Sequence, residues 1–155
     1  MNSSHQIEHL LLEYARRIDN GDFVGIGELF SRGKIIIDDA THIEGSDNVS
    51  SMYTNTTRRY EDGTPRTHHV TTNIEIHIVG NSAESSSYFT VFQGMKDFPL
   101  QAIITGQYFD SFYLYDDGWW FKSRKIEIRQ IGDVSHHLLI EISVSYTHLT
   151  LPTKA

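Results

Sequence analysis

The chain has 155 residues, a formal net charge of −7 at pH 7 and no cysteine. Its length and its 39% of hydrophobic residues are typical of one folded globular domain. The lack of cysteine excludes disulfides, a thiol nucleophile and thiolate metal sites. No run of Lys and Arg exceeds two residues, which argues against nucleic acid as a partner.

No segment approaches the roughly 18 consecutive apolar residues that a membrane-spanning helix needs. The first residues, Met1 to His5, also lack the apolar core of a signal peptide. The sequence therefore predicts a cytoplasmic protein that has no membrane partner.

Helical signals come first along the chain. Apolar residues recur at helical spacing in the first segment: Ile7, Leu10, Leu11, Tyr14 and Ile18. The pair Asn20-Gly21 ends this helix, because Gly21 can adopt a positive φ. Asp22 is placed to cap a second, short helix. A hairpin over 34–44 and a third helix over about 46–60 follow.

After Pro65 the period of the apolar residues changes to two, which is typical of strands. Four strands are expected, over about 67–79, 85–95, 100–115 and 119–131. Helices grouped first and antiparallel strands after them predict the α+β class, with helices packed on one face of a curved sheet. We expect a single domain over 1–143.

The last dozen residues differ in character from the rest. Val144 to Thr153 reads like a translated sequencing adapter in the frame GTC TCT TAT ACA CAT CTG ACG CTG CCG ACG. We therefore predict that 144–155 is a non-native read-through tail and exclude it from the fold. On this interpretation the native C-terminus is missing.

Asp19 is the first candidate for chemistry. It borders the apolar stripe of the first helix and lies at the C-terminal end, where the helix dipole disfavours an anion unless a cation or donor compensates. A carboxylate there can serve a histidine. The alternative is an ordinary solvated Asp in the last helical turn.

His68 and His69 are the next candidates. Strict alternation groups His68 with Val70 and the isoleucines that follow, and groups His69 with Asn73, so periodicity alone favours His68 as the buried one. A bulge in a strongly curved strand would change this assignment. Either imidazole can also be a surface or structural side chain.

Arg124 shares its alternation with Trp120, Ile126 and Ile128, which form an otherwise apolar face. A guanidinium there either pairs with a carboxylate in the core or points into a cavity. The flanking lysines favour a third possibility, a charged strand exposed to water.

Tyr14 and Tyr108 carry hydroxyls that can polarise a carbonyl or hold a leaving group, although both residues also suit an aromatic core. Gly106 marks a bend in the sheet or leaves room for a ligand. The pair His136-His137 lacks an acidic ligand motif, and no metal site is predicted.

Two stretches together indicate a family: Thr67-His68-His69-Val70-Thr71-Thr72-Asn73, and Gly106-Gln107-Tyr108-Phe109-Asp110 running on to Asp117-Gly118-Trp119-Trp120 and Arg124. With a helix that ends in Asp19, this order resembles the polyketide-cyclase-like (SnoaL-like) branch of the nuclear transport factor 2 fold, over roughly Ile7 to Leu138. The resemblance implies a cone-shaped α+β fold whose N-terminal helices pack on a curved antiparallel or mixed sheet and enclose a pocket.

The resemblance also implies a function. Its pattern of a His four residues before an Asn selects His69 as the base, with Asp19 as its orienting partner. Arg124 would stabilise a leaving group or oxyanion, and Tyr14 would be an auxiliary donor. Side chains expected to bind the substrate are Tyr108, Asn73 and Trp120. The implied activity is that of a cofactor-free lyase or isomerase, similar to a dehydratase, on a small hydrophobic cyclic molecule.

Two other functions stay open, because this fold hosts many activities. The pocket can hold an apolar ligand without turning it over, or the domain can be a structural subunit, as in the small subunits of ring-hydroxylating dioxygenases. A sheet face dense in Phe, Tyr and Trp suggests a homo-oligomer, either a dimer or a trimer.

Overall fold

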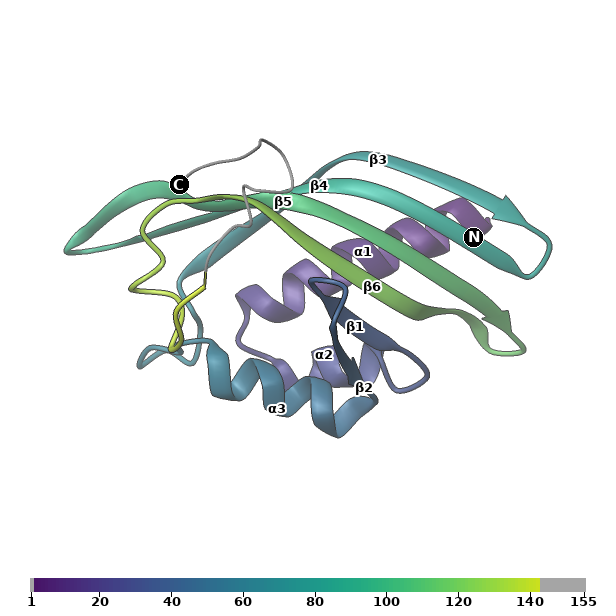
Figure 1. The fold of residues 1–155 in the computed structure, drawn as a ribbon, viewed down its shortest axis with the longest axis horizontal. Helices are drawn as coiled ribbons and strands as arrows, with labels where there is room; N and C mark the ends of the chain where they lie inside the picture. Colours follow the sequence, from purple (N-terminus) through teal and green to yellow (C-terminus); the bar gives the residue numbers. More distant parts are fainter. Residues whose placement is uncertain (1, 143–155) are drawn as a thin grey trace.

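The computed structural model describes residues 2–142 (Figure 1). The expected read-through tail, 144–155, lies outside the described residues. The helices are α1 Ser3–Asp19, α2 Phe23–Leu29 and α3 Ser46–Thr56. The strands are β1 Lys34–Ile37, β2 Thr41–Glu44, β3 Thr67–Val79, β4 Ser82–Met95, β5 Phe98–Tyr115 and β6 Gly118–Ile131.

All six of these strands join one sheet in the order β2-β1-β6-β5-β4-β3. Neighbouring strands are antiparallel except for β1 and β6, which run parallel. The long strands β3 to β6 lie side by side and bend over α1, while α2, α3 and the short hairpin gather on the same side (Figure 1). The α+β class, with helices on one face of a curved sheet of mixed direction, is confirmed.

The apolar stripe of α1 is buried against the sheet, as its spacing predicts. The buried residues are Ile7, Leu11, Tyr14, Ala15 and Ile18. Gly21, with φ of 72°, turns the chain after Asn20. The Asp22 carboxylate then accepts a hydrogen bond from the Gly25 N–H at 2.9 Å and caps α2. Within residues 2–142, no helix is long and apolar enough to cross a membrane.

The third helix is shorter than predicted, because it ends at Thr56 rather than near Tyr60. The main chain after it pairs with the C-terminal segment instead of continuing the helix. Thr57 forms an isolated antiparallel bridge with Leu138, and the Arg58 N–H donates to the His137 carbonyl at 2.8 Å. A distant segment therefore determines where α3 stops.

Gly106 lies where β5 and β6 shift register and where the sheet is closely packed. A Cβ atom at Gly106 would lie 2.2 Å from the Glu127 carbonyl oxygen and 2.6 Å from the Phe89 ring. The Phe89 ring stacks on Tyr108 with 4.4 Å between centroids. The space beside Gly106 is therefore filled by Phe89, and the expectation that it leaves room for a ligand is wrong.

Candidate active site

Asp19 and His69 meet at the junction of α1 and β3. Asp19 Oδ1 lies 2.6 Å from His69 Nδ1, and the main-chain N–H of His69 donates to Asp19 Oδ2 at 2.8 Å. The Thr67 hydroxyl donates to Oδ1 at 2.8 Å. Because an ionised carboxylate only accepts, Nδ1 of His69 carries the proton and Nε2 is the nitrogen left for another partner.

A β-bulge brings His69, rather than His68, to Asp19. The register of β3 against β4 shifts between Thr72 and Glu75, and Asn73 inside this interval has a φ of 54°. The bulge changes the alternation, so that His69 shares the helix-facing side with the isoleucines of β3. The side chain of His69 is 7% exposed, whereas His68 is exposed to solvent.

The pKa of the Asp19 carboxyl is the balance of burial and hydrogen bonding. Burial alone raises this pKa, but the hydrogen bonds and charge of His69, with the Thr67 hydroxyl, outweigh burial and lower the pKa below its usual range. A carboxyl with a lowered pKa stabilises the fold fully above its ordinary pKa, and this contribution is lost as pH falls through the lowered value.

We expect His69→Gln to raise the pKa of Asp19. The variant removes the hydrogen bond and charge of the imidazole, while burial, the main-chain N–H and Thr67 remain, so less is left to offset the effect of burial on the pKa. Carboxyl ¹³C NMR against pH measures this change. The Asp133 carboxyl, whose pKa is lowered by hydrogen bonds from Ser135, is the internal control and should titrate unchanged. An unchanged Asp19 curve would contradict the coupling.

His137 is a third side chain at this site, although its sequence pattern raised only the question of a metal ligand. Its ring meets His69 edge-on, with 6.5 Å between centroids and 65° between planes. The residue is 5% exposed, and its Nδ1 has no hydrogen-bond partner among residues 2–142. Burial, helped by the neighbouring His69 and opposed by Asp19, lowers the pKa of His137 to about 4. His137 is therefore neutral at physiological pH.

Arg124 forms a buried ion pair deeper in the core. Its Nε and Nη2 donate to the two carboxylate oxygens of Asp110 at 2.8 and 3.0 Å, and both side chains are 0% exposed. Burial opposes the charge of Arg124, but the Asp110 carboxylate outweighs it and raises the pKa of Arg124. Of the alternatives for Arg124, the pairing with a core carboxylate is the one observed.

Aromatic rings surround this ion pair. The guanidinium carbon of Arg124 lies 3.6 Å from the Tyr108 ring centroid and 4.3 Å from that of Tyr14. The hydroxyl of Tyr14 forms a hydrogen bond with the hydroxyl of Tyr53, a residue of α3 that was not among the candidates from the sequence. Burial raises the pKa of all three tyrosines, which are therefore protonated at neutral pH.

Comparison with known families decides what kind of domain this is. Residues 1–125 match the SnoaL-like domain family. The chain belongs to the SnoaL-like family. Comparison of the sequence with the curated proteins finds no match.

Solved structures share the fold of this SnoaL-like domain. A nuclear transport factor 2-like protein with a cystatin-like fold from Novosphingobium aromaticivorans is 14% identical, with 86% of each chain covered and a TM-score of 0.70. A protein provisionally named a scytalone dehydratase from the same organism is 22% identical, with 84% of this chain and 86% of that chain covered and a TM-score of 0.66. LinA is 14% identical, with 91% and 93% covered and a TM-score of 0.67. At these identities the likeness shows the fold alone.

The SnoaL-like domain does not bring Asn73 or Trp120 to the Asp19–His69 pair. Asn73 is exposed in the bulge of β3. Trp120 donates to Asp117 at 3.0 Å beside the hairpin and stacks on Arg32. In β6 an extra residue between Phe121 and Ser123 changes the alternation, so Trp120 and Arg124 face opposite sides of the sheet.

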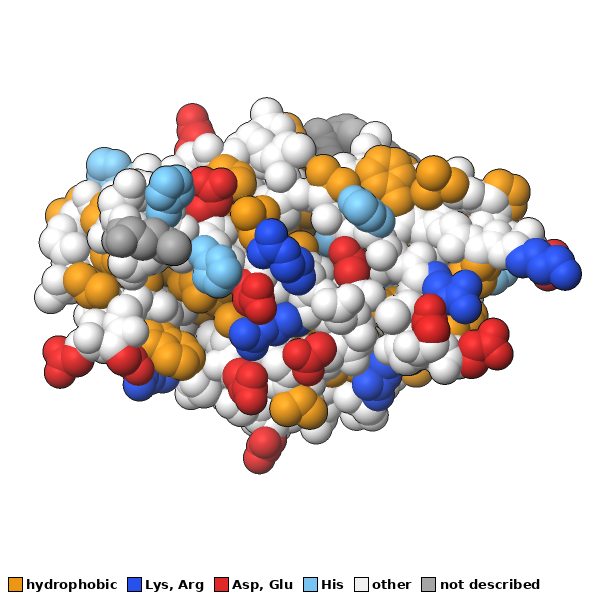
Figure 2. All heavy atoms as spheres, turned by 180° about the vertical axis from the view of Figure 1, so that it is seen from behind, with side chains coloured by type: hydrophobic (Ala, Val, Ile, Leu, Met, Phe, Trp, Pro, Cys, Tyr) orange, Lys and Arg blue, Asp and Glu red, His pale blue; other side chains and the backbone are white. Residues whose placement is uncertain are grey.

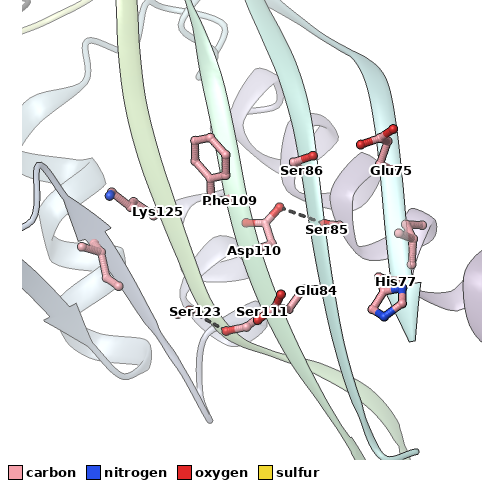
Figure 3. A pocket seen from close by; sticks show the side chains of 12 residues that line it. Glu75, His77, Glu84, Ser85, Ser86, Phe109, Asp110, Ser111, Ser123 and Lys125 are labelled. Atoms are coloured by element: carbon pink, nitrogen blue, oxygen red, sulfur yellow. Dashed lines mark hydrogen bonds between the residues drawn. The ribbon is translucent and has the colours of Figure 1, made fainter. Parts of the chain in front are cut away.

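A groove with a volume of about 790 Å³ lies on the face of the sheet opposite the helices (Figure 3). Most of its lining comes from residues that alternate along the strands with the buried core, such as Phe109, Lys125, Glu75 and His77, but Ser85 and Asp110 of the buried side also line it. The lining includes neither Asp19 nor His69. Figure 2 shows positive and negative side chains intermixed on the face that it presents, without a continuous basic stripe.

Proposed function

We propose that this SnoaL-like domain is a cofactor-free lyase or isomerase in which His69 removes a proton from carbon. The observation that supports the proposal is the Asp19–His69 contact at 2.6 Å, with two further donors on the carboxylate. The carboxylate fixes the imidazole tautomer and orientation, and it stabilises the imidazolium that forms when Nε2 takes a proton.

A small hydrophobic, cyclic substrate suits this proposal. The side chains around the helix–sheet interior are mostly aromatic and aliphatic, and polar groups there are few. The fold neighbours include proteins provisionally named as dehydratases and LinA, which supports elimination chemistry as the class to test first.

Tyr14 and Arg124 take supporting roles in the proposal. Tyr14 is the auxiliary donor, because its hydroxyl is protonated and buried. Arg124 acts on it through the ring that its guanidinium covers and adds positive potential to the site. Tyr108 forms part of the aromatic wall. No role is proposed for Asn73 or Trp120, given where the structure places them.

A three-part screen tests the proposal. Cyclic secondary alcohols, cyclic chlorides and cyclic ketones of one or two rings are incubated with the protein in D₂O. Mass spectrometry then detects loss of water, loss of HCl or uptake of deuterium. We expect turnover above background in one of these classes. Ligand-induced thermal stabilisation without turnover in any class would contradict catalysis and favour the binding-module alternative.

A further inference from the structure

The unpartnered Nδ1 of His137 is the feature of the site that the Asp19–His69 pair does not explain. A buried polar atom without a hydrogen bond destabilises the fold, so native proteins rarely keep one without a reason. The ring that carries this buried atom meets the His69 ring edge-on, with 6.5 Å between centroids. One small molecule can therefore contact both imidazoles.

The main chain, rather than the ring itself, fixes the position of His137. Its carbonyl accepts from the Arg58 N–H at 2.8 Å, and the Leu139 N–H donates to the Thr56 carbonyl at 2.9 Å. The buried amide of Gln93 donates to the His136 carbonyl at 3.0 Å. These bonds attach the segment to the end of α3 and to β4, so the imidazole is held rigidly without using its own nitrogen.

The charge state of His137 limits its chemistry. Because burial keeps this ring neutral at physiological pH, it cannot serve as a strong acid or as a cation. A neutral imidazole can donate an N–H hydrogen bond to a carbonyl oxygen and polarise it without giving up its proton. Asp19 does not occupy this donor, since the hydrogen bonds of its carboxylate go to Thr67 and His69.

We propose that the His137 Nδ1–H binds the carbonyl oxygen of the substrate, on the carbon next to the one that His69 deprotonates. The C–H bond breaks and its proton passes to His69 Nε2. Its electron pair forms a C=C bond, and the π pair of the carbonyl moves onto the oxygen to give an enolate that His137 stabilises. No electrons are gained or lost overall. The substrate class is thereby a hydrophobic cyclic carbonyl compound, an inference that rests on the proposed function.

The test uses 4-nitrophenol, whose phenolate is a planar ring oxyanion similar to an enolate. Its dissociation constant is measured by absorbance with wild type, His137→Leu and His137→Gln. We expect His137→Leu to weaken binding about tenfold or more, the loss of one hydrogen bond to an anion. His137→Gln should retain most of the affinity, because an amide N–H also donates. His68→Leu, which removes an exposed imidazole nearby, should bind as wild type does.

A second measurement needs no variant. In ¹⁵N NMR of the wild type, the Nδ1 signal of His137 should shift when 4-nitrophenol is added. Equal affinity in wild type and His137→Leu, an unmoved Nδ1 signal, or no binding to the wild type would each overturn the inference. The readout is affinity rather than turnover, so the carbonyl-oxygen site and the proposed reaction can fail separately. If no substrate is turned over, the affinity pattern can still establish a phenolate site at His137. If a substrate is turned over but the affinity pattern is absent, only the proposed role of His137 is wrong.

Discussion

Replacing His69 by Gln is expected to lower kcat/KM by about a thousandfold or more on any substrate that the screen identifies. General-base catalysis contributes typically 10²–10⁴ in rate, and Gln has no basic nitrogen. Asp19→Asn should lower kcat/KM by a comparable factor, although it keeps the imidazole. The reason is that an amide N–H at position 19 can donate to Nδ1, so the Nε2 atom would then carry the proton and could not accept one from the substrate.

The neighbouring His68 provides the matched control for this experiment. His68→Gln makes the same chemical change one residue earlier, on a side chain that is exposed, and should leave kcat/KM within a factor of two or so of wild type. Steady-state kinetics and thermal unfolding of all three variants separate lost catalysis from lost folding. Turnover retained in His69→Gln would remove His69 from the role of base.

Breaking the ion pair between Asp110 and Arg124 is expected to give the largest loss of stability. Asp110→Asn leaves the buried guanidinium without a counter-charge, and disrupting one partner of a buried pair typically costs about 3–5 kcal/mol of unfolding free energy. Urea denaturation at constant pH measures it. Replacing both residues by apolar ones, Asp110→Leu with Arg124→Met, should recover much of the loss, because no unpaired charge is then buried.

Asp117→Asn is the matched control for the buried pair. Arg32 donates to the two oxygens of Asp117 at 2.9 and 3.1 Å, nearly the same geometry as the core pair. Both Arg32 and Asp117 are exposed to water. Solvent screens exposed pairs, so the control variant should unfold close to wild type. Equal losses in Asp110→Asn and Asp117→Asn would show that burial does not set the cost.

The order of elements and the helix-facing side of α1 could be predicted because they depend on local patterns. The position of Asp19 at a helix end left an ordinary solvated carboxylate open, and the family resemblance selected it as the partner of a histidine; in the structure its carboxylate contacts His69. A strict period of two could not predict where the bulges lie, and so could not assign the faces of the residues beyond them. The bulge at Asn73 exchanges the faces of His68 and His69, and the extra residue in β6 separates Trp120 from Arg124. In both strands a single residue changes every assignment beyond it.

The long-range partners of Tyr14 and His69 illustrate a second limit. Tyr53 reaches Tyr14 across 39 residues, and His137 reaches His69 from a segment that has no periodicity. No spacing rule connects such pairs. The only available signal for His137 was its position as the second of two adjacent histidines near the end of the expected domain. That position does not indicate which way its side chain faces.

The bulge in β3 inserts one extra residue, which shifts the inward and outward alternation of every residue on one side of it relative to the other. Deleting one residue near Asn73 would restore unbroken alternation, and then either His69 or the isoleucines beyond it must change faces, because the two halves of the strand can no longer both face α1. A chain with this architecture can thus exchange which of two adjacent histidines it presents to α1 by losing a single residue, with every site residue unchanged. The number of residues in β3 near Asn73 therefore determines the site as much as the identity of His69 does.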